Sequence, residues 1–260
     1  MSVSWDPAAY LRHADERSRP FHDLLARVDA QDPARVVDLG CGPGGLTRDL
    51  AERWPSAHVL GVDSSAEMIE RAARYAVPGR CEFVQGDVRE WTSDRPVDVV
   101  VSNATLQWVP DHRALLPRWV EGLAPDGWLA FQVPANFDAP SHLLLRELAT
   151  SPRFKTLLEG VLRHSDAVEQ PQTYLETLAG AGCSVDVWQT TYLHVLPGED
   201  AVLGWVRGTA LRPVLDALGP ADTHEFIAAY TSELRRAYPR GAHGTVFAFR
   251  RTFVVARRTL

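Results

Sequence analysis

The stretch Val36-Val37-Asp38-Leu39-Gly40-Cys41-Gly42-Pro43-Gly44 decides the fold. Its apolar start predicts a buried strand, and the three alternate glycines predict a tight turn into a helix. Glycines in such a turn let a ligand approach the main chain closely, and the free N–H groups at the start of the next helix favour an anionic group. Taken alone the pattern is weak, because an ordinary strand–helix turn can use the same glycines.

Strand and helix patterns alternate on either side of this turn. We predict apolar strands at 34–40, 58–63, 81–87, 97–103 and 128–134, with helices at 46–54, 64–76 and 113–123. Strands that are nearly all apolar and are separated by helices are typical of a parallel sheet covered on both faces. Right-handed crossovers between such strands give a doubly wound fold.

The second half of the chain follows a different pattern. Long strands are predicted at 184–196 and 244–258, with helical stretches at 136–169, 172–183 and 197–240. We therefore expect an α/β fold with a Rossmann-like, doubly wound, seven-stranded sheet and an inserted helical lid. The expected organisation is a single domain, 1–260, with a core of about 30–135, 171–196 and 244–260 and a lid of about 1–29, 136–170 and 197–243.

Acidic residues end the second and third predicted strands. Asp63 lies 25 residues after Asp38, where a carboxylate is placed to accept hydrogen bonds from ribose hydroxyls. Asp87 ends the next strand, where it could meet an exocyclic amine such as that of adenine. The glycine spacing is G-x-G-x-G, unlike the G-x-G-x-x-G of dinucleotide-binding turns, and this disfavours a dehydrogenase.

The blocks DLGCGPG (38–44), GVDSS (61–65) and GDVREW (86–91) resemble the motifs of class I S-adenosylmethionine-dependent methyltransferases in order and spacing. The resemblance implies S-adenosyl-L-methionine as cofactor. It implies that the glycines line the methionine end, that Asp38 helps to organise the methionine ammonium, that Asp63 holds the ribose and that Asp87 with Val88 holds the adenine. The candidate cofactor-binding residues are Asp38, Gly40, Gly42, Gly44, Asp63, Ser64, Asp87, Val88 and Asn103.

A narrower resemblance covers almost the whole chain. The blocks YLRHADERSRP, SNATLQWVPDH, WQTTYLHVLP, GWVRGTALRP and FVVARR are similar to the trans-aconitate 2-methyltransferase family. The resemblance implies methyl transfer to a carboxylate of trans-aconitate, which gives the monomethyl ester and S-adenosylhomocysteine. The alternatives are a methyltransferase for a different small acid, hydroxyl or amine, and a module that binds the cofactor or a partner without catalysis.

A tricarboxylate substrate requires cations and hydrogen-bond donors, and the arginine fork matches a carboxylate best. We favour Arg212, at a predicted helix end before Pro213, with Arg207 as the second arginine of that segment. Tyr192 and His194 are alternate residues of one predicted strand and share a face. Trp108 follows the fourth strand and is a candidate wall of the cavity. A carboxylate nucleophile is already ionised at pH 7, so we predict no catalytic base, dyad or triad.

Composition limits the kinds of partner, metal site and cellular location that the protein can be expected to have. A net charge of −6 argues mildly against nucleic acid as a partner. The three cysteines have no metal-type pairing, and we expect no metal site. No run approaches 18 consecutive apolar residues, and the first 20 residues lack the apolar stretch of a signal peptide. We expect a cytoplasmic protein that neither spans a membrane nor binds nucleic acid; the oligomeric state is left open.

Overall fold

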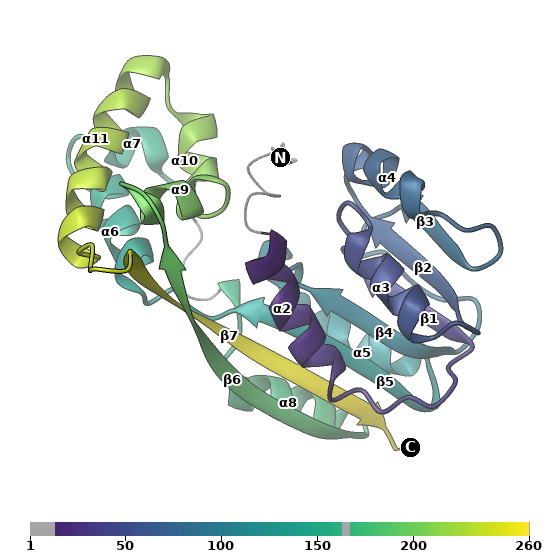
Figure 1. Ribbon diagram of the computed structural model, residues 1–260. Helices are drawn as coiled ribbons and strands as arrows, with labels where there is room; N and C mark the ends of the chain where they lie inside the picture. The colour runs from purple at the N-terminus through teal and green to yellow at the C-terminus, as the bar shows by residue number, and fades with distance from the viewer. Residues whose placement is uncertain (1–13, 163–166, 260) are drawn as a thin grey trace. The chain divides into compact units, whose positions relative to one another are not determined.

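The computed structural model describes residues 14–162 and 167–259, and a seven-stranded mixed sheet organises them (Figure 1). The strand order is β3-β2-β1-β4-β5-β7-β6, in which β1 to β5 pair in parallel and β7 is antiparallel to β5. The strands are β1 (Arg35–Leu39), β2 (His58–Asp63), β3 (Cys81–Gln85), β4 (Val97–Asn103), β5 (Leu123–Pro134), β6 (Cys183–Leu196) and β7 (Thr245–Arg258). The predicted doubly wound seven-stranded sheet is therefore confirmed.

Helices and short 3-10 turns connect the strands within the described ranges. They are α2 (Ala14–Leu25), α3 (Gly45–Arg53), α4 (Ala66–Ala72), α5 (Leu115–Glu121), α6 (Pro140–Ala149), α7 (Lys155–Leu158), α8 (Pro171–Gly180), α9 (Ala201–Arg207), α10 (Arg212–Ala217) and α11 (Pro220–Ala237), with 3-10 turns η1 (Ala73–Tyr75), η2 (Leu106–Trp108) and η3 (His112–Ala114). Ser65 caps α4 by accepting the Met68 N–H (3.3 Å). The predicted helix at 64–76 thus begins later, and it ends in a 3-10 turn.

The described chain divides into two compact units. The first, which we call the sheet unit, comprises 17–134, 167–190 and 251–259. The second, which we call the helical unit, comprises 14–16, 135–162 and 191–250. The unit boundaries fall inside β6 and inside β7. Most of the predicted lid at 136–170 and 197–243 belongs to the helical unit, whereas 17–29 belongs to the sheet unit; a single domain with a lid stays a prediction.

A buried hydrogen-bonded pair joins α8 to the segment before α5 in the sheet unit. The Nδ1 atom of His112 lies 3.3 Å from the Val109 carbonyl oxygen, and its Nε2 atom lies 2.8 Å from the Tyr174 hydroxyl. That hydroxyl also accepts the Glu169 N–H (3.1 Å). Burial lowers the pKa of His112 and favours the neutral ring. The neutral ring then donates from Nδ1 and accepts the tyrosine proton at Nε2, which satisfies each polar group.

The helical unit has a core of its own, built on aromatic side chains. Trp205 of α9 is 2% exposed and stacks on His194 at 4.7 Å between ring centroids. Phe154 and Phe226 meet edge to face at 5.0 Å. The Tyr230 hydroxyl donates to the Ser141 carbonyl oxygen (2.7 Å), which ties α11 to α6. Buried aromatic contacts of this kind stabilise a unit that has little sheet of its own.

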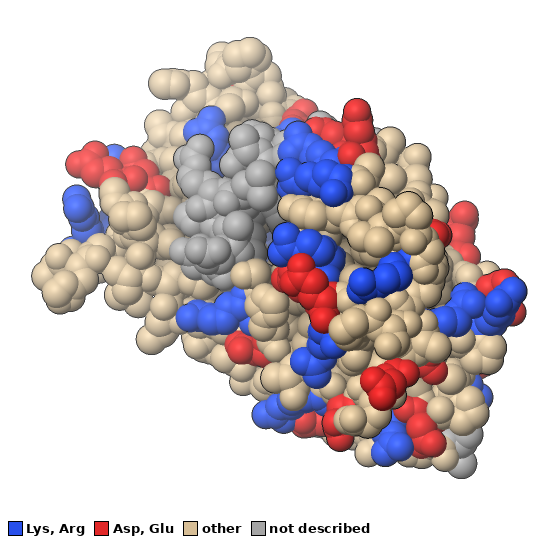
Figure 2. Space-filling model, turned by 45° about the vertical axis from the view of Figure 1, so that its right-hand side comes forward, with Lys and Arg blue, Asp and Glu red and all other residues tan. Residues whose placement is uncertain are grey.

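The surface carries both signs of charge. Figure 2 shows Lys and Arg interspersed with Asp and Glu on one face. The described residues include exposed ion pairs, such as Arg153 with Glu225 (2.7 Å), and pairs of this kind contribute little stability. Within the described ranges, no helix is long and apolar enough to cross a membrane. The three cysteines are buried.

Candidate functional site

The site lies where the strand order changes direction. The chain winds from β1 to β2 and β3 on one side and returns to β4 on the other side of β1. In doubly wound sheets, ligands bind outside the carboxyl ends of the strands at such a switch point. The glycine turn, which we define as residues 40–44, follows β1 at this edge, and Asn103 ends the neighbouring strand β4.

Each of the three glycines has a positive φ, and their surroundings differ. At Gly40 (φ +82°), an added Cβ would lie 2.0 Å from Thr105 Oγ1. At Gly44 (φ +82°), it would lie 2.7 Å from the Ala72 Cβ. At Gly42 (φ +53°), it would meet no described atom within 4 Å. Two glycines therefore allow the chain to pack closely, whereas the space beside the Gly42 Cα is open to a ligand.

Asp63 connects the end of β2 to the glycine turn. Its Oδ2 atom accepts the Gly42 N–H (2.9 Å), and its Oδ1 atom accepts the Ser65 N–H (2.9 Å). Burial raises the pKa of this carboxyl, although both hydrogen bonds oppose the shift. The side chain is half-buried, so each oxygen can accept a further hydrogen bond from a ligand hydroxyl.

Asp38 is buried beneath the same turn, with 2% of its surface exposed. Its Oδ2 atom accepts the Thr47 hydroxyl (2.6 Å). Burial raises the pKa of Asp38 to about 7, the nearby Asp63 charge adds to the increase, and the Thr47 hydrogen bond opposes it. A carboxyl in this state loses its proton readily when a cation arrives beside it.

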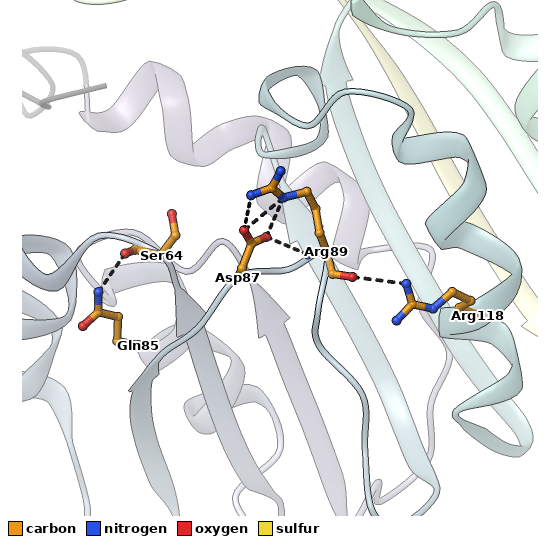
Figure 3. A network of polar contacts seen from close by, with 5 residues as sticks. All are labelled: Ser64, Gln85, Asp87, Arg89 and Arg118. Atoms are coloured by element: carbon orange, nitrogen blue, oxygen red, sulfur yellow. Dashed lines mark hydrogen bonds and ion pairs between the residues drawn. The ribbon is translucent and has the colours of Figure 1, made fainter. Parts of the chain in front are cut away.

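The predicted adenine residues, Asp87 and Val88, follow β3, and Figure 3 shows Asp87 with its polar contacts. The Asp87 carboxylate accepts the Arg89 backbone N–H (2.8 Å) and pairs with the Arg89 guanidinium, which lowers the pKa of Asp87. The Arg118 guanidinium donates to the Arg89 carbonyl oxygen (3.2 Å). Val88 is buried, whereas Ser64 is exposed and accepts the Gln85 amide at its carbonyl oxygen (3.1 Å). Asp87 is thus already oriented by Arg89.

A chain of amide and guanidinium groups ends at Asn103. Arg251 Nη1 donates to Gln132 Oε1 (2.9 Å), and Gln132 Nε2 donates to Asn103 Oδ1 (2.6 Å). Arg251 and Gln132 are 5% and 1% exposed, whereas Asn103 is half-buried. The sequence analysis selected Asn103 and missed Gln132 and Arg251. The register places Asn103 of β4 opposite Gln132 of β5, and Arg251 of β7 opposite Pro134, two residues from Gln132. This arrangement is a tertiary property that no local sequence pattern shows.

The predicted substrate residues lie in the helical unit, apart from Trp108, which is half-buried in η2 of the sheet unit. Tyr192 and His194 share one face of β6, with their rings stacked at 6.4 Å, and both are buried. Arg207 is exposed at the last position of α9. Arg212 begins α10 and pairs with Asp216 (3.1 Å). It lies at a helix start, not at the predicted helix end, because Gly208 ends α9 before it.

The helical unit contains a small cavity that the sequence analysis missed. Its lining residues are Phe137, His142, Leu145, Arg146, Leu162, Ala210 and Pro213. Arg146 Nη2 donates to the Phe137 carbonyl oxygen (2.7 Å), which holds the guanidinium at the cavity. Nearby in sequence, Asn136 is 3% exposed, and neither atom of its amide has a partner among the described residues. The i, i+4 spacing of His142 and Arg146 on one helix was the available sequence signal.

Comparison with known proteins places this geometry in context. Residues 36–127 match a family model described as a methyltransferase domain. The trans-aconitate 2-methyltransferase of Streptomyces avermitilis is 60% identical, covering 98% of this chain and 97% of that protein. The trans-aconitate 2-methyltransferase of Mycolicibacterium gilvum is 54% identical, covering 97% of this chain and 98% of that protein. The crystal structure of the Bacillus protein YcgJ, 16% identical, covers 93% of this chain and 99% of its own with a TM-score of 0.61, and supports the fold alone.

Proposed function

The chain belongs to the trans-aconitate 2-methyltransferase family, and from this membership we propose that it transfers the methyl group of S-adenosyl-L-methionine to one carboxylate of trans-aconitate. The products are the monomethyl ester and S-adenosylhomocysteine. The observation that carries the proposal is 60% identity over nearly the whole of both chains, because that range includes the helical unit, which we propose recognises the acceptor. We further propose a small-molecule acceptor and a cytoplasmic location.

The residues of the sheet unit fit the cofactor. The space beside the Gly42 Cα is open, and the Asp38 carboxyl, with its pKa of about 7, can ionise beside the methionine ammonium. Asp63 retains acceptor capacity for ribose hydroxyls. Asp87 and Val88 would meet the adenine, and Asn103 the methionine end or the acceptor. When bound, S-adenosyl-L-methionine supplies an electrophilic methyl group on a positively charged sulfur.

The protein's part in the reaction is to position and desolvate the nucleophile. An acceptor carboxylate has a reference pKa of about 4 and is ionised at pH 7, so no side chain has to remove a proton. Methyl transfer forms an O–C bond and breaks the C–S bond, whose electron pair stays on sulfur. Alignment of oxygen, carbon and sulfur and the removal of water from the carboxylate are the effects that accelerate such a displacement.

The helical unit offers two arginines for the carboxylates that do not react. Arg146 lines the cavity described above, and Pro213, which lines it too, directly follows Arg212 in the chain. A guanidinium binds a carboxylate through two parallel hydrogen bonds. We propose that these arginines, with Tyr192 and His194 on β6, recognise the acceptor, and that Arg212 exchanges Asp216 for it.

Label transfer tests the proposed reaction. The purified protein is incubated with methyl-labelled S-adenosylmethionine and trans-aconitate, and with cis-aconitate, citrate or isocitrate in parallel. We expect base-labile ester label mainly from trans-aconitate. Preferential labelling of a different acid would change the proposed methyl acceptor and leave the proposed reaction type unchanged. No label from any acid, in a protein that binds S-adenosylhomocysteine by calorimetry, would contradict the proposal.

Substitution of the arginines tests their assignment. We expect Arg146→Met and Arg212→Met each to raise the KM for trans-aconitate by roughly tenfold to a hundredfold, because each variant loses the charged hydrogen bonds of one guanidinium. Affinity for S-adenosylhomocysteine should be unchanged. Arg153→Met is the matched control, because Arg153 pairs with Asp222 and Glu225 instead. An unchanged KM in both variants would remove these arginines from acceptor binding.

A further inference from the structure

We propose that Gln132 and Arg251 are positioning residues that hold the Asn103 amide with its N–H groups toward a ligand carboxylate. The proposal rests on the function proposed above. It adds to that function how the Asn103 amide is oriented and which residues orient it. Three adjacent strands, β4, β5 and β7, each contribute one residue. The register pairs Asn103 with Gln132.

The direction of each hydrogen bond follows from Arg251. A guanidinium has five N–H donors and no acceptor, so the Gln132 atom that it contacts at 2.9 Å has to be the oxygen. The other end of the Gln132 amide is then a donor, and the Asn103 atom that lies 2.6 Å from it has to be an oxygen too. The amide orientations of both residues are therefore set by chemistry.

Burial keeps this arrangement fixed. Gln132 and Arg251 are almost inaccessible to water, so reversing the Gln132 amide would place two donors against each other in a low-dielectric interior. Such a contact leaves buried donors unsatisfied, which costs more than the hydrogen bond contributes. Thr105, two residues along, donates to the Asn103 carbonyl oxygen (3.3 Å) and restrains the backbone of the same strand end.

The consequence is a pair of N–H donors at the switch point. With its oxygen committed to Gln132, Asn103 has only Nδ2 left, and among the described residues that atom has no hydrogen-bond partner. Asn103 is half-buried at the carboxyl end of β4, next to the strand that leads into the glycine turn. N–H donors at this place favour a negatively charged group of the ligand. Both the methionine end of the cofactor and the substrate trans-aconitate carry carboxylates.

The Gln132→Glu variant tests the proposal. Its side chain keeps the acceptor for Arg251 and loses the donor toward Asn103, so Asn103 has to turn Nδ2 inward and present Oδ1 to the ligand. We expect roughly tenfold to a hundredfold weaker binding of the carboxylate that Asn103 contacts. Calorimetry with S-adenosylhomocysteine measures the cofactor carboxylate, and the KM for trans-aconitate measures the acceptor carboxylate.

Asn103→Asp should show the same pattern of loss, because one oxygen still accepts from Gln132 and the other replaces Nδ2. Gln189→Glu is the matched control: Gln189 of β6 donates to Thr252 of β7 (3.0 Å), so the variant adds the same charge to the sheet without reaching Asn103. Thermal melting monitors folding, and Arg251→Lys, which still donates to Gln132, should restore most of the binding that Arg251→Met loses.

The outcomes separate the two proposals. If Gln132→Glu weakens the binding of S-adenosylhomocysteine, Asn103 contacts the cofactor. If the variant raises the KM for trans-aconitate and leaves the affinity for S-adenosylhomocysteine unchanged, Asn103 contacts trans-aconitate. If no tricarboxylate is methylated, weaker binding of S-adenosylhomocysteine would still support the positioning role while the proposed reaction fails. The positioning role would be overturned if folded Gln132→Glu protein bound S-adenosylhomocysteine with unchanged affinity and its KM for trans-aconitate were unchanged or, for lack of turnover, could not be measured.

Discussion

Asp38 lies beneath the glycine turn with its carboxyl bonded to Thr47, and burial raises its pKa to about 7. Without a cation beside it, the carboxyl therefore keeps its proton over most of the range between pH 4 and pH 7. If the methionine ammonium binds beside it, the bound state favours the ionised form, and binding releases the proton below pH 7. Binding should then strengthen as the pH rises.

We predict that affinity for S-adenosylhomocysteine increases by up to about tenfold per pH unit as the pH rises toward 7 and then levels off. Calorimetric titrations at pH 5.5, 6.5 and 7.5 measure this. Asp38→Asn removes the titrating group and should flatten the profile. Asp98→Asn serves as control, because Asp98 accepts the Ala34 and Arg35 N–H groups at the opposite end of β1 and is remote from the glycine turn. An equally flat profile for the native protein would contradict this role of Asp38.

Single residues also show how far the sequence alone could lead. Asp63 was selected from its place at a strand end, and the structure joins it to Gly42 by a hydrogen bond. Its contact with the ribose stays a prediction. Gln132 could not be selected, because a glutamine in an apolar strand has no local pattern, and its partner Arg251 lies 119 residues away. Arg146 was missed because its i, i+4 spacing from His142 does not show that both side chains line a cavity, which is completed by the distant residues Ala210 and Pro213.

Within the glycine turn, two apparently equivalent glycines should respond differently to alanine. Gly40→Ala places a Cβ 2.0 Å from Thr105 Oγ1 at φ +82°, so we expect it to lower the free energy of unfolding by about 2–4 kcal/mol. Gly42→Ala meets no described atom and should cost only about 1–2 kcal/mol of backbone strain. Because its methyl group enters the space open to a ligand, Gly42→Ala should weaken S-adenosylhomocysteine binding by at least about tenfold.

Chemical denaturation and calorimetry on both variants measure the two effects. The double change Gly40→Ala with Thr105→Gly tests the cause, since it removes the clash and should recover part of the stability. If Gly42→Ala bound as tightly as the native protein, the open side of this turn could not be where the cofactor lies.

At the level of secondary structure, apolar strands were easier to predict than the interruptions within strands and helices. The strands at 58–63 and 97–103 were predicted with their observed bounds. β5 starts at Leu123 and not at Trp128. The Pro-Asp-Gly residues form an irregularity inside the strand, where the pairing with β4 shifts register between Val97 and Val99 and Asp126 has φ +63°. The helical prediction at 197–240 missed two interruptions. Helix α9 ends at Arg207, before Gly208, and α10 ends at Ala217, before Gly219, which is the N-cap residue of α11.

The two units should respond to different ligands. Hydrogen exchange followed by mass spectrometry should show S-adenosylhomocysteine protecting peptides of the sheet unit around Gly42 and Ser65. Trans-aconitate added to that complex should protect peptides of the helical unit around Arg146 and Ala210. Peptides from α5 supply the reference. If trans-aconitate protected only the sheet unit, the assignment of acceptor recognition to the helical unit would be wrong.

The strand order has a consequence for how the molecule is made. β7 lies between β5 and β6, and β6 has β7 as its neighbour in the sheet. On the ribosome, residues 183–196 emerge before residues 245–258 have been translated, so β6 must wait without its partner while the intervening helices are synthesised. A nascent chain at this stage exposes two strand edges that could pair with other chains. Slow translation or a pause between residues 196 and 245 would prolong that stage and the need for chaperones.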